Sequence, residues 1–297
     1  DDQHGTAITV GAAILNGLRV VNKMPEDIKL VSTGGGSAGI ACLNLLVSMG
    51  VKKENIFLID RIGLVYEGRT EEMDPYKAAF AHKTKDRTLD DIIDDADVFL
   101  GLSAPKLLTQ EMVKRMDARP VIMALANPEP EISPEDAKAA NPNAIIATGR
   151  SDYPNQVNNV LCFPFIFRGA LDVGATTINE EMKLACVHAI ADLTMAESSE
   201  IVAAAYSGED LKFGPEYIIP KPFDPRLILE VPPAVAKAAM DSGVATRPIK
   251  DFDAYRENLA RFIFRSGLVM KPLFEKAKKN PQRVVFAEGE DERVLRA

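Results

Sequence analysis

The fold of this chain is decided by the stretch Leu30-Val31-Ser32-Thr33-Gly34-Gly35-Gly36-Ser37-Ala38-Gly39. Apolar residues from Ile28 to Val31 predict a short buried strand, and apolar residues at helical spacing follow from Ile40 to Val47. Gly34, Gly36 and Gly39 have the G-x-G-x-x-G spacing of dinucleotide-binding turns. Because a strand is predicted before it and a helix after it, a nucleotide site is favoured over an ordinary flexible loop.

Each glycine of this spacing has its own physical role. The first allows the tight turn, the second lets a pyrophosphate approach the backbone, and the third lets helix and strand pack closely. The phosphates would bind the free N–H groups and the positive dipole end of the new helix. The predicted cofactor-binding residues of this turn are Gly34, Gly35, Gly36, Ser37, Ala38 and Gly39.

Strands and helices alternate through the first half of the chain. Apolar runs predict further strands at residues 55–59, 98–102, 121–126 and 144–147, with helical patterns between them. The apolar runs are continuous, as in strands that are buried on both faces. The sequence therefore predicts an α/β fold with a doubly wound, mainly parallel, Rossmann-like sheet between Ile28 and Thr148.

Small or polar residues stand at the ends of four of these strands. Ligands of doubly wound sheets bind at the carboxyl ends of the strands. Gly34, Asp60, Ser103 and Asn127 are all predicted to lie there, and so to converge on one crevice. Ala104 follows Ser103, and such small residues suit close contact with a flat ring.

Asp60 is the candidate residue for selecting the cofactor. It follows the glycine turn at close to the ~20 residues expected of the acidic group that binds the ribose hydroxyls. A carboxylate favours NAD because it would repel a 2′-phosphate, whereas the neighbouring Arg61 and Lys85 offer cations. We expect NADP as the cofactor, with NAD as the alternative.

The composition is that of a water-soluble protein of one or two domains. The 297 residues are 46% hydrophobic, and the net charge of −8 without a basic patch argues against nucleic-acid binding. Cys42, Cys162 and Cys186 lie far apart among apolar residues, so we expect buried thiols in a reducing compartment. Without a bilayer-spanning apolar run or a signal peptide, the sequence predicts a cytoplasmic protein with no membrane partner.

The second half of the chain is predicted to be mostly helical. Apolar residues at helical spacing predict helices over residues 178–196, 231–242 and 253–268, with Gly243 ending the second of them. Residues 208–225 are rich in proline and glycine and predict a loop packed against the helices. The sheet is thus expected to be followed by a helical segment.

Two longer motifs resemble those of a known family, the malic enzymes. Residues 1–7, Asp-Asp-Gln-His-Gly-Thr-Ala, are similar to the segment that carries a metal-binding aspartate and opens the cofactor domain. Residues 151–164, with Asn158-Asn159 at their centre, resemble the bacterial form of the loop that contacts the substrate. Ala126-Asn127-Pro128 matches a further active-site asparagine, and the resemblance covers about the first 270 residues in the family's order.

The resemblance implies a reaction and a set of ligands. Malic enzymes oxidatively decarboxylate malate to pyruvate and CO2, pass a hydride to NADP or NAD, and use Mg²⁺ or Mn²⁺. The metal would chelate malate and stabilise the enolate left when CO2 departs. Hard carboxylate ligands suit Mg²⁺ or Mn²⁺ better than zinc.

The family's site residues are carried over by motif. Asp2 is implied to be a metal ligand with Asp1 as its neighbour, and Asn159 to bind the substrate carboxylate. Asn127 is implied to lie near the nicotinamide and the substrate. Thr6 and Asn158 complete the implied cofactor contacts. Without the resemblance, helix capping would explain the two aspartates and a polar turn the two asparagines.

The family's general-acid tyrosine, general-base lysine and two other metal ligands precede the position of Asp1. No catalytic residue is therefore expected in this chain, and Tyr66, Tyr76 and Lys77 are not assigned those roles because they lie outside the family's motifs. The chain has no initiator methionine and ends inside a predicted helix. We expect it to be a segment of a longer polypeptide.

Residues 283–297 resemble the opening of a phosphate acetyltransferase domain. The resemblance implies a malic-enzyme cofactor domain over residues 1–270, a linker over 271–282, and the start of a truncated second domain from 283. This order is typical of the large bacterial NADP-dependent malic enzymes, for which we expect a homo-oligomer.

Two other classes of protein share parts of this pattern. An amino-acid dehydrogenase has a similar cofactor domain but gives no reason for the opening residues 1–6. A non-catalytic nucleotide-sensing or assembly module would share only the glycine turn with this sequence. By itself the segment is expected to bind nucleotide weakly and to turn over no malate.

Overall fold

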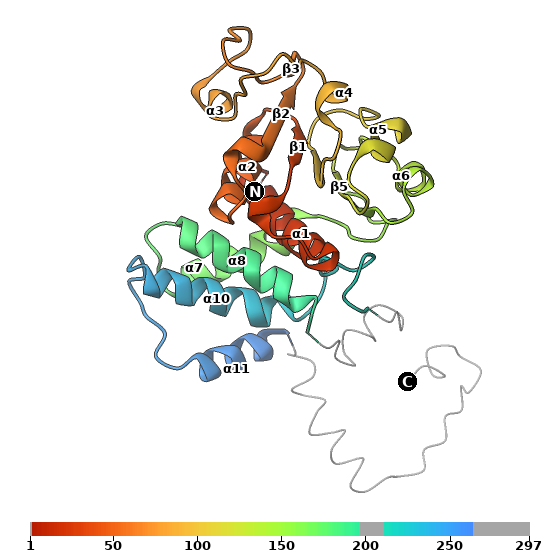
Figure 1. Ribbon diagram of the computed structural model, residues 1–297. Coiled ribbons are helices and arrows are strands. Elements are labelled where there is room, and N and C mark those ends of the chain that lie inside the picture. Colours follow the sequence, from red (N-terminus) through yellow and green to blue (C-terminus); the bar gives the residue numbers. More distant parts are fainter. Residues whose placement is uncertain (1, 197–210, 264–297) are drawn as a thin grey trace, which may run out of the picture. The chain divides into compact units, whose positions relative to one another are not determined.

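The computed structural model describes residues 2–196 and 211–263 of the 297-residue chain. It divides into two compact units, Asp1–Lys250 and Asp251–Ala297. The first unit holds the sheet and most of the helices (Figure 1). In the second, the described part is helix α11 (Phe252–Ile263). Among the described residues, no helix combines the length and the apolar composition that a bilayer crossing requires.

The first unit is built on one six-stranded sheet with the order β3-β2-β1-β4-β5-β6. All neighbouring strands pair in parallel except β3, which is antiparallel to β2. The strands are β1 (Leu30–Thr33), β2 (Ile56–Asp60), β3 (Gly63–Leu64), β4 (Val98–Gly101), β5 (Val121–Ala124) and β6 (Ile145–Thr148). The prediction of a doubly wound, mainly parallel sheet is confirmed.

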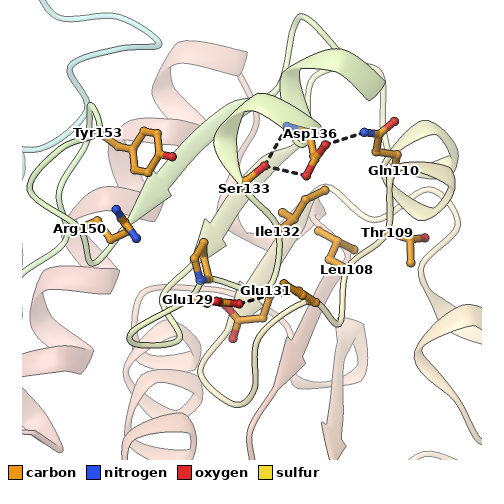
Figure 2. A pocket seen from close by; sticks show the side chains of 12 residues that line it. Leu108, Thr109, Gln110, Glu129, Glu131, Ile132, Ser133, Asp136, Arg150 and Tyr153 are labelled. Atoms are coloured by element: carbon orange, nitrogen blue, oxygen red, sulfur yellow. Dashed lines mark hydrogen bonds and ion pairs between the residues drawn. The ribbon is translucent and has the colours of Figure 1, made fainter.

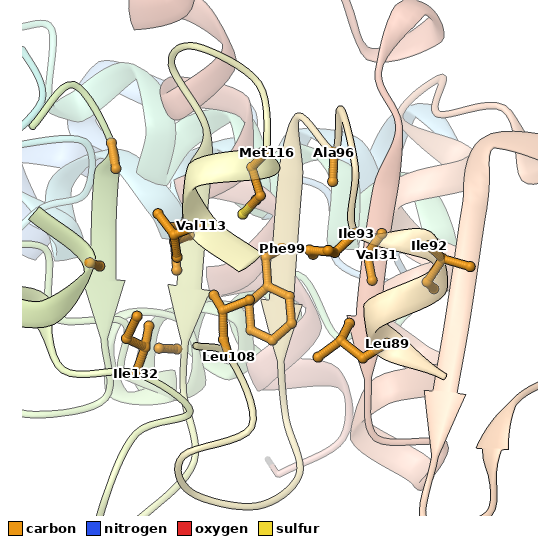
Figure 3. Close-up of a cluster of buried hydrophobic side chains, with 14 of the residues drawn as sticks. Val31, Leu89, Ile92, Ile93, Ala96, Phe99, Leu108, Val113, Met116 and Ile132 are labelled. Carbon is orange, nitrogen blue, oxygen red and sulfur yellow. The ribbon is translucent and has the colours of Figure 1, made fainter. Parts of the chain in front are cut away.

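Four of the six strands are buried on both faces, which explains their continuous apolar runs. Every residue of β1, β4, β5 and β6 is buried. On one face, Phe99 lies at the centre of a cluster with Ile93, Leu108, Val113 and Ile132 (Figure 3). Burial of this apolar surface fixes the strands, and so fixes where their carboxyl ends lie.

Helices cover the sheet, and local sequence signals start several of them. Thr109 and Ser133 cap their helices by accepting the N–H of Met112 and Asp136, as their sequence positions predict. Between the strands lie α2 (Ser37–Ser48), α3 (Pro75–Ala78), α4 (Leu89–Ile92), α5 (Gln110–Arg115), α6 (Pro134–Ala140) and the 3-10 turns η1 (Pro25–Asp27) and η2 (Lys53–Asn55).

A helical layer packs beside the sheet (Figure 1). It comprises α1 (His4–Val21), the 3-10 turn η3 (Asn159–Leu161), α7 (Phe163–Asp172), α8 (Glu180–Leu193) and α10 (Leu227–Asp241). The buried Asn16 of α1 donates to the carbonyls of Ala191 and Ile218, each at 2.8 Å. This side chain joins three segments that are far apart in the sequence.

Some predicted helices have other bounds in the structure. Helix α3 is a single turn, Pro75–Ala78, and His82 beyond it forms a β-bridge with Tyr66. Helix α10 begins at Leu227, earlier than the predicted start at Val231. Its end is as predicted, with Gly243 following at φ +75°.

The edge strand β3 and helix α7 of the first unit were not predicted. The edge strand β3 is two residues long, which is too short to show the alternation of apolar and polar residues that predicts a strand. Helix α7 contains Gly169, where a Cβ would lie 2.6 Å from the carbonyl oxygen of Pro232. That glycine allows α7 and α10 to cross closely, a requirement set by tertiary packing alone. The predicted linker at 271–282, the domain start at 283–297 and Asp1 lie outside the described residues.

Candidate functional site

The glycine turn between β1 and α2 is shaped by two close backbone contacts. Gly34 has φ +110°, and a Cβ there would lie 2.5 Å from the carbonyl oxygen of Leu102. A Cβ on Gly39 would lie 1.9 Å from the carbonyl oxygen of Gly34. Neither position has room for a Cβ atom. The turn therefore requires glycine at both.

Gly36 differs from its two neighbours in the motif. It is the N-cap of α2, no side chain caps that helix, and a Cβ on Gly36 would meet nothing within 4 Å. The start of a 12-residue helix therefore faces open space. Free N–H groups and the positive end of the helix dipole together suit a phosphate.

A cavity of about 500 Å³ lies beside this turn. It is lined on one side by Gly35, Gly36 and Ser37, and on the other by His4 of α1 and Lys183 of α8. Burial and then the nearby Lys183 ammonium lower the pKa of His4 below its ordinary value. The open start of α2 thus has room for a ligand beside it.

The loops after β4 and β5 are held together by Glu131, which the sequence analysis did not single out. Its side chain accepts the backbone N–H of Ser103 with one oxygen and that of Ala126 with the other, both at 3.1 Å. Burial outweighs these bonds and raises the pKa of Glu131. Ser103 also donates its hydroxyl to Thr33 Oγ1 at 2.9 Å, which joins its loop to the end of β1.

A second cavity, of about 410 Å³, is lined partly by residues of the same loops (Figure 2). Asp136 lies between Ser133 and Gln110 and is bonded to both, at 2.8 Å each. Arg150 is likewise bonded to Asp152. Since these polar groups already have structural partners, we assign the cavity no ligand.

Asn127 lies after β5 and faces the end of β6. A Cβ on Gly149 would lie 3.2 Å from Asn127 Nδ2. The absence of a side chain at Gly149 therefore leaves room for this amide. The structure thus brings Asn127 to the same edge of the sheet as the glycine turn and Ser103, as predicted. Ala104, beside Ser103, is exposed.

Asp60 lies at the end of β2, but its carboxylate is not free. It is 6% exposed and is bound by the Arg69 guanidinium and by Lys77 Nζ, the latter at 2.9 Å. Burial opposes ionisation of Asp60, but the hydrogen bonds from Arg69 and Lys77 outweigh it and hold the pKa below its ordinary value. Arg61 instead points to Glu72, with its own side chain 79% exposed.

Lys77 is the second residue that sequence reasoning missed. A Cβ on Gly35 would lie 3.0 Å from its Cε, so the lysine side chain lies over the glycine turn. Helix α3 brings it there after Asp74 caps the helix by accepting the N–H of Tyr76 and Lys77. Only the fold reveals this, because seventeen residues separate Lys77 from Asp60.

The two asparagines of the 151–164 loop lie at the start of the helical layer. Asn158 accepts the N–H of Val160 at 2.9 Å and so caps the 3-10 turn η3. Asn159 is the first residue of that turn, and its Nδ2 donates to Asp2 Oδ1 at 3.4 Å. Thr6 lies one turn into α1 from Asp2. The structure therefore brings the predicted metal ligand and the predicted substrate amide together.

Asp2 suits a hard divalent cation chemically, since its carboxylate is exposed and accepts a single long bond. It does not form a complete site. Among residues 2–196 and 211–263, no three carboxylate, imidazole or thiol groups are placed to hold a metal ion together. The part of the chain that the structure describes therefore supplies fewer than three such ligands here.

Comparison with known proteins identifies the family. Residues 3–204 match the family model described as "Malic enzyme, NAD binding domain". The NADP-dependent malic enzyme of Salmonella typhimurium is 65% identical over this whole chain, which covers 39% of that protein. The NAD-dependent malic enzyme of Rhizobium meliloti is 62% identical, with the same coverage of both chains. The chain thus spans well under half the length of these relatives.

Solved structures agree in fold. The crystal structure of malic enzyme from Pyrococcus horikoshii has a TM-score of 0.78 and 36% identity, over 94% of this chain and 63% of that one. Malic enzyme of Entamoeba histolytica has a TM-score of 0.76 and 31% identity, over 92% of this chain and 55% of its own. With its glycine turn, parallel sheet and matched residues, the chain belongs to the malic enzyme family and comprises its NAD-binding domain.

Proposed function

We propose that this chain acts, as part of a longer polypeptide, in the oxidative decarboxylation of malate to pyruvate and CO2 with reduction of NADP. The observation that carries the proposal is the contact between Asn159 Nδ2 and Asp2 Oδ1 at 3.4 Å. A neutral amide donor and a hard carboxylate lie side by side there, although 157 residues separate them. A 2-hydroxy acid with its metal needs both kinds of group in one place.

The chemistry would be divided between this chain and the rest of the polypeptide. Asp2 would bind Mg²⁺ or Mn²⁺ with Asp1 beside it, and Asn159 and Asn127 would hold the carboxylate of malate. A bound cation would polarise the forming ketone. The acid and base groups would come from outside this chain, as the resemblance to the family implies.

The full-length protein tests this proposal. With Mn²⁺ and NADP present, we expect malate to drive reduction of the nucleotide, while amino acids do not. Turnover of an amino acid in place of malate would favour the dehydrogenase alternative. Nucleotide binding without turnover of either would favour a sensing or assembly module.

The isolated 297-residue chain should bind nucleotide weakly and turn over no malate. The phosphate site is local to the glycine turn, but one carboxylate does not hold Mg²⁺ or Mn²⁺ against water, and the resemblance to the family implies that the base lies outside this chain. The measurement is a fluorescence titration with NADPH, followed by an assay of malate oxidation with Mn²⁺. Malate-dependent reduction at the rate of the full-length protein would show that the catalytic residues are misassigned.

The cations around Asp60 support NADP over NAD. Arg69 and Lys77 neutralise the carboxylate that would otherwise repel a 2′-phosphate. Lys77 also lies over the glycine turn, on the side from which the ribose would extend toward β2. We infer that Lys77 binds the 2′-phosphate of NADP.

Replacing Lys77 by alanine tests that inference. We expect the dissociation constant for NADP to rise about tenfold, the loss of one charge-assisted contact, while that for NAD changes less or falls. The matched control is Lys53→Ala, at the opposite end of β2, which should alter neither constant. An equal loss of affinity for both cofactors in Lys77→Ala would mean that Lys77 shapes the turn without binding the 2′-phosphate.

We also propose that the protein self-associates through α7. Its Phe163, Phe167 and Leu171 recur at helical spacing and are 45%, 44% and 67% exposed. A second copy would cover this apolar stripe. Light scattering on the full-length protein should give an oligomer, and Phe167→Glu should reduce its mass; a monomer in both cases would contradict the proposal.

A further inference from the structure

Two cysteines that the proposed function does not use lie in contact in the helical layer. Cys162 immediately precedes α7 and Cys186 lies within α8, and their sulfur atoms are 3.8 Å apart. Both are buried, with 1% and 0% of their surface exposed. The third cysteine, Cys42, is buried in α2 and makes no such contact with either.

The two thiols differ in their surroundings. Cys162 lines a cavity of about 170 Å³ together with Lys183 and the ring of Phe163. The cavity gives a small oxidant room beside Cys162. Cys186 does not line that cavity. Burial, and then the contact with Cys162, raises the pKa of Cys186 well above its ordinary value, so it remains a thiol.

We propose that Cys162 and Cys186 form a redox-modification site at which a peroxide produces a disulfide. Hydrogen peroxide oxidises the Cys162 thiol to a sulfenic acid, and one water is released. The Cys186 sulfur then attacks the sulfenic sulfur, the S–O bond breaks, and a second water leaves with the Cys186 proton. Two thiols are oxidised and one peroxide is reduced, so no other reactant is required.

The geometry permits this step with a small movement. A disulfide needs the sulfurs about 2.05 Å apart, so they must approach by about 1.7 Å from their present contact. Rotation of the two side chains with a slight shift of the α7 start can supply that. Cys42 has no partner sulfur in contact and would stay reduced.

The shift would reach the proposed substrate site through η3. The backbone N–H of Cys162 donates to the carbonyl of Asn159 at 3.0 Å, and the Asn159 side chain contacts Asp2. Drawing Cys162 toward α8 would therefore displace Asn159 from its position beside Asp2. This consequence rests on the proposed function, whereas the disulfide itself does not.

The experiment begins with the reduced full-length protein treated with hydrogen peroxide. We expect digestion without reductant to yield a Cys162–Cys186 cross-linked peptide, which dithiothreitol removes. Cys186→Ala should yield no cross-link from Cys162, and Cys42→Ala should behave as the wild type. Circular dichroism checks that both variants are folded. The cross-link in the wild-type protein is tested directly, so that result holds even if a variant fails to fold.

The second readout is the kinetics of malate oxidation. We expect the oxidised protein to have a KM for malate raised at least about threefold, with the affinity for NADP unchanged and full recovery on reduction. Peroxide treatment that leaves both thiols reduced, or that stops at sulfinic acid on Cys162, would overturn the site. A cross-link with an unchanged KM would overturn the coupling to Asn159 alone. Absence of malate turnover before any oxidation would count against the proposed function but not the disulfide.

Discussion

We expect Gly36→Ala to leave the protein folded and to raise the dissociation constant for NADP at least about tenfold, whereas Gly39→Ala should destabilise the domain itself. The added methyl group is the same in both variants. At Gly36 it points into open space at the start of α2, where a pyrophosphate would lie. At Gly39 it would lie 1.9 Å from the backbone oxygen of Gly34, which no side-chain rotation relieves.

Two measurements on each variant separate these effects. Chemical denaturation should show a loss of about 3 kcal/mol for Gly39→Ala, as for an overpacked core, and under about 1 kcal/mol for Gly36→Ala. Titration with NADPH reports the affinity. Wild-type affinity in Gly36→Ala would mean that the pyrophosphate does not bind at this turn, and a stable Gly39→Ala would mean that strand and helix can separate without cost.

Glu131→Leu should lower the free energy of unfolding by about 3 kcal/mol, because it leaves one buried and one partly buried N–H group without an acceptor. Those groups belong to Ser103 and Ala126, in the loops after β4 and β5. Leucine has a similar volume and fits over Gly101, where the carboxylate now packs. The loss therefore measures hydrogen bonding more than packing. The affinity for the cofactor should fall as well, because Ser103 and Asn127 belong to these two loops.

A graded series strengthens this experiment. Glu131→Gln keeps one acceptor oxygen and should lose about half as much stability as Glu131→Leu. Glu129→Gln, two residues earlier and exposed in its pair with Lys106, should stay within about 0.5 kcal/mol of the wild type. Equal stability of Glu131→Leu and Glu129→Gln would show that the two loops do not depend on the buried carboxylate.

Much of the cofactor half of the site could be read from the sequence, because its signals are local. A strand, three spaced glycines and a helix follow one another directly, although α2 begins at Ser37, before the apolar spacing that predicted it from Ile40. The caps Thr109 and Ser133 are also local, since a hydroxyl bonds an N–H three residues on. The parallel sheet follows because buried strands and intervening helices have few other ways to connect.

The partners of the predicted residues were decided only by the tertiary structure. The position of Asp60 could be read from the sequence, but its neutralisation by Arg69 and Lys77 depends on how the chain after β3 folds back. Glu131 reads as one acidic residue among several until burial and two backbone donors single it out. The contact between Cys162 and Cys186 likewise depends on the packing of α7 and α8.

The physical reason is the range of the interactions. By itself the sequence determined the glycine turn, the strands and the caps, since backbone conformation and burial pattern are set by neighbouring residues. Charge pairing, helix crossings such as that at Gly169, and the meeting of Asp2 with Asn159 join residues brought together only when the core has formed. Those contacts carry no period or spacing along the chain, so only the folded structure determines them.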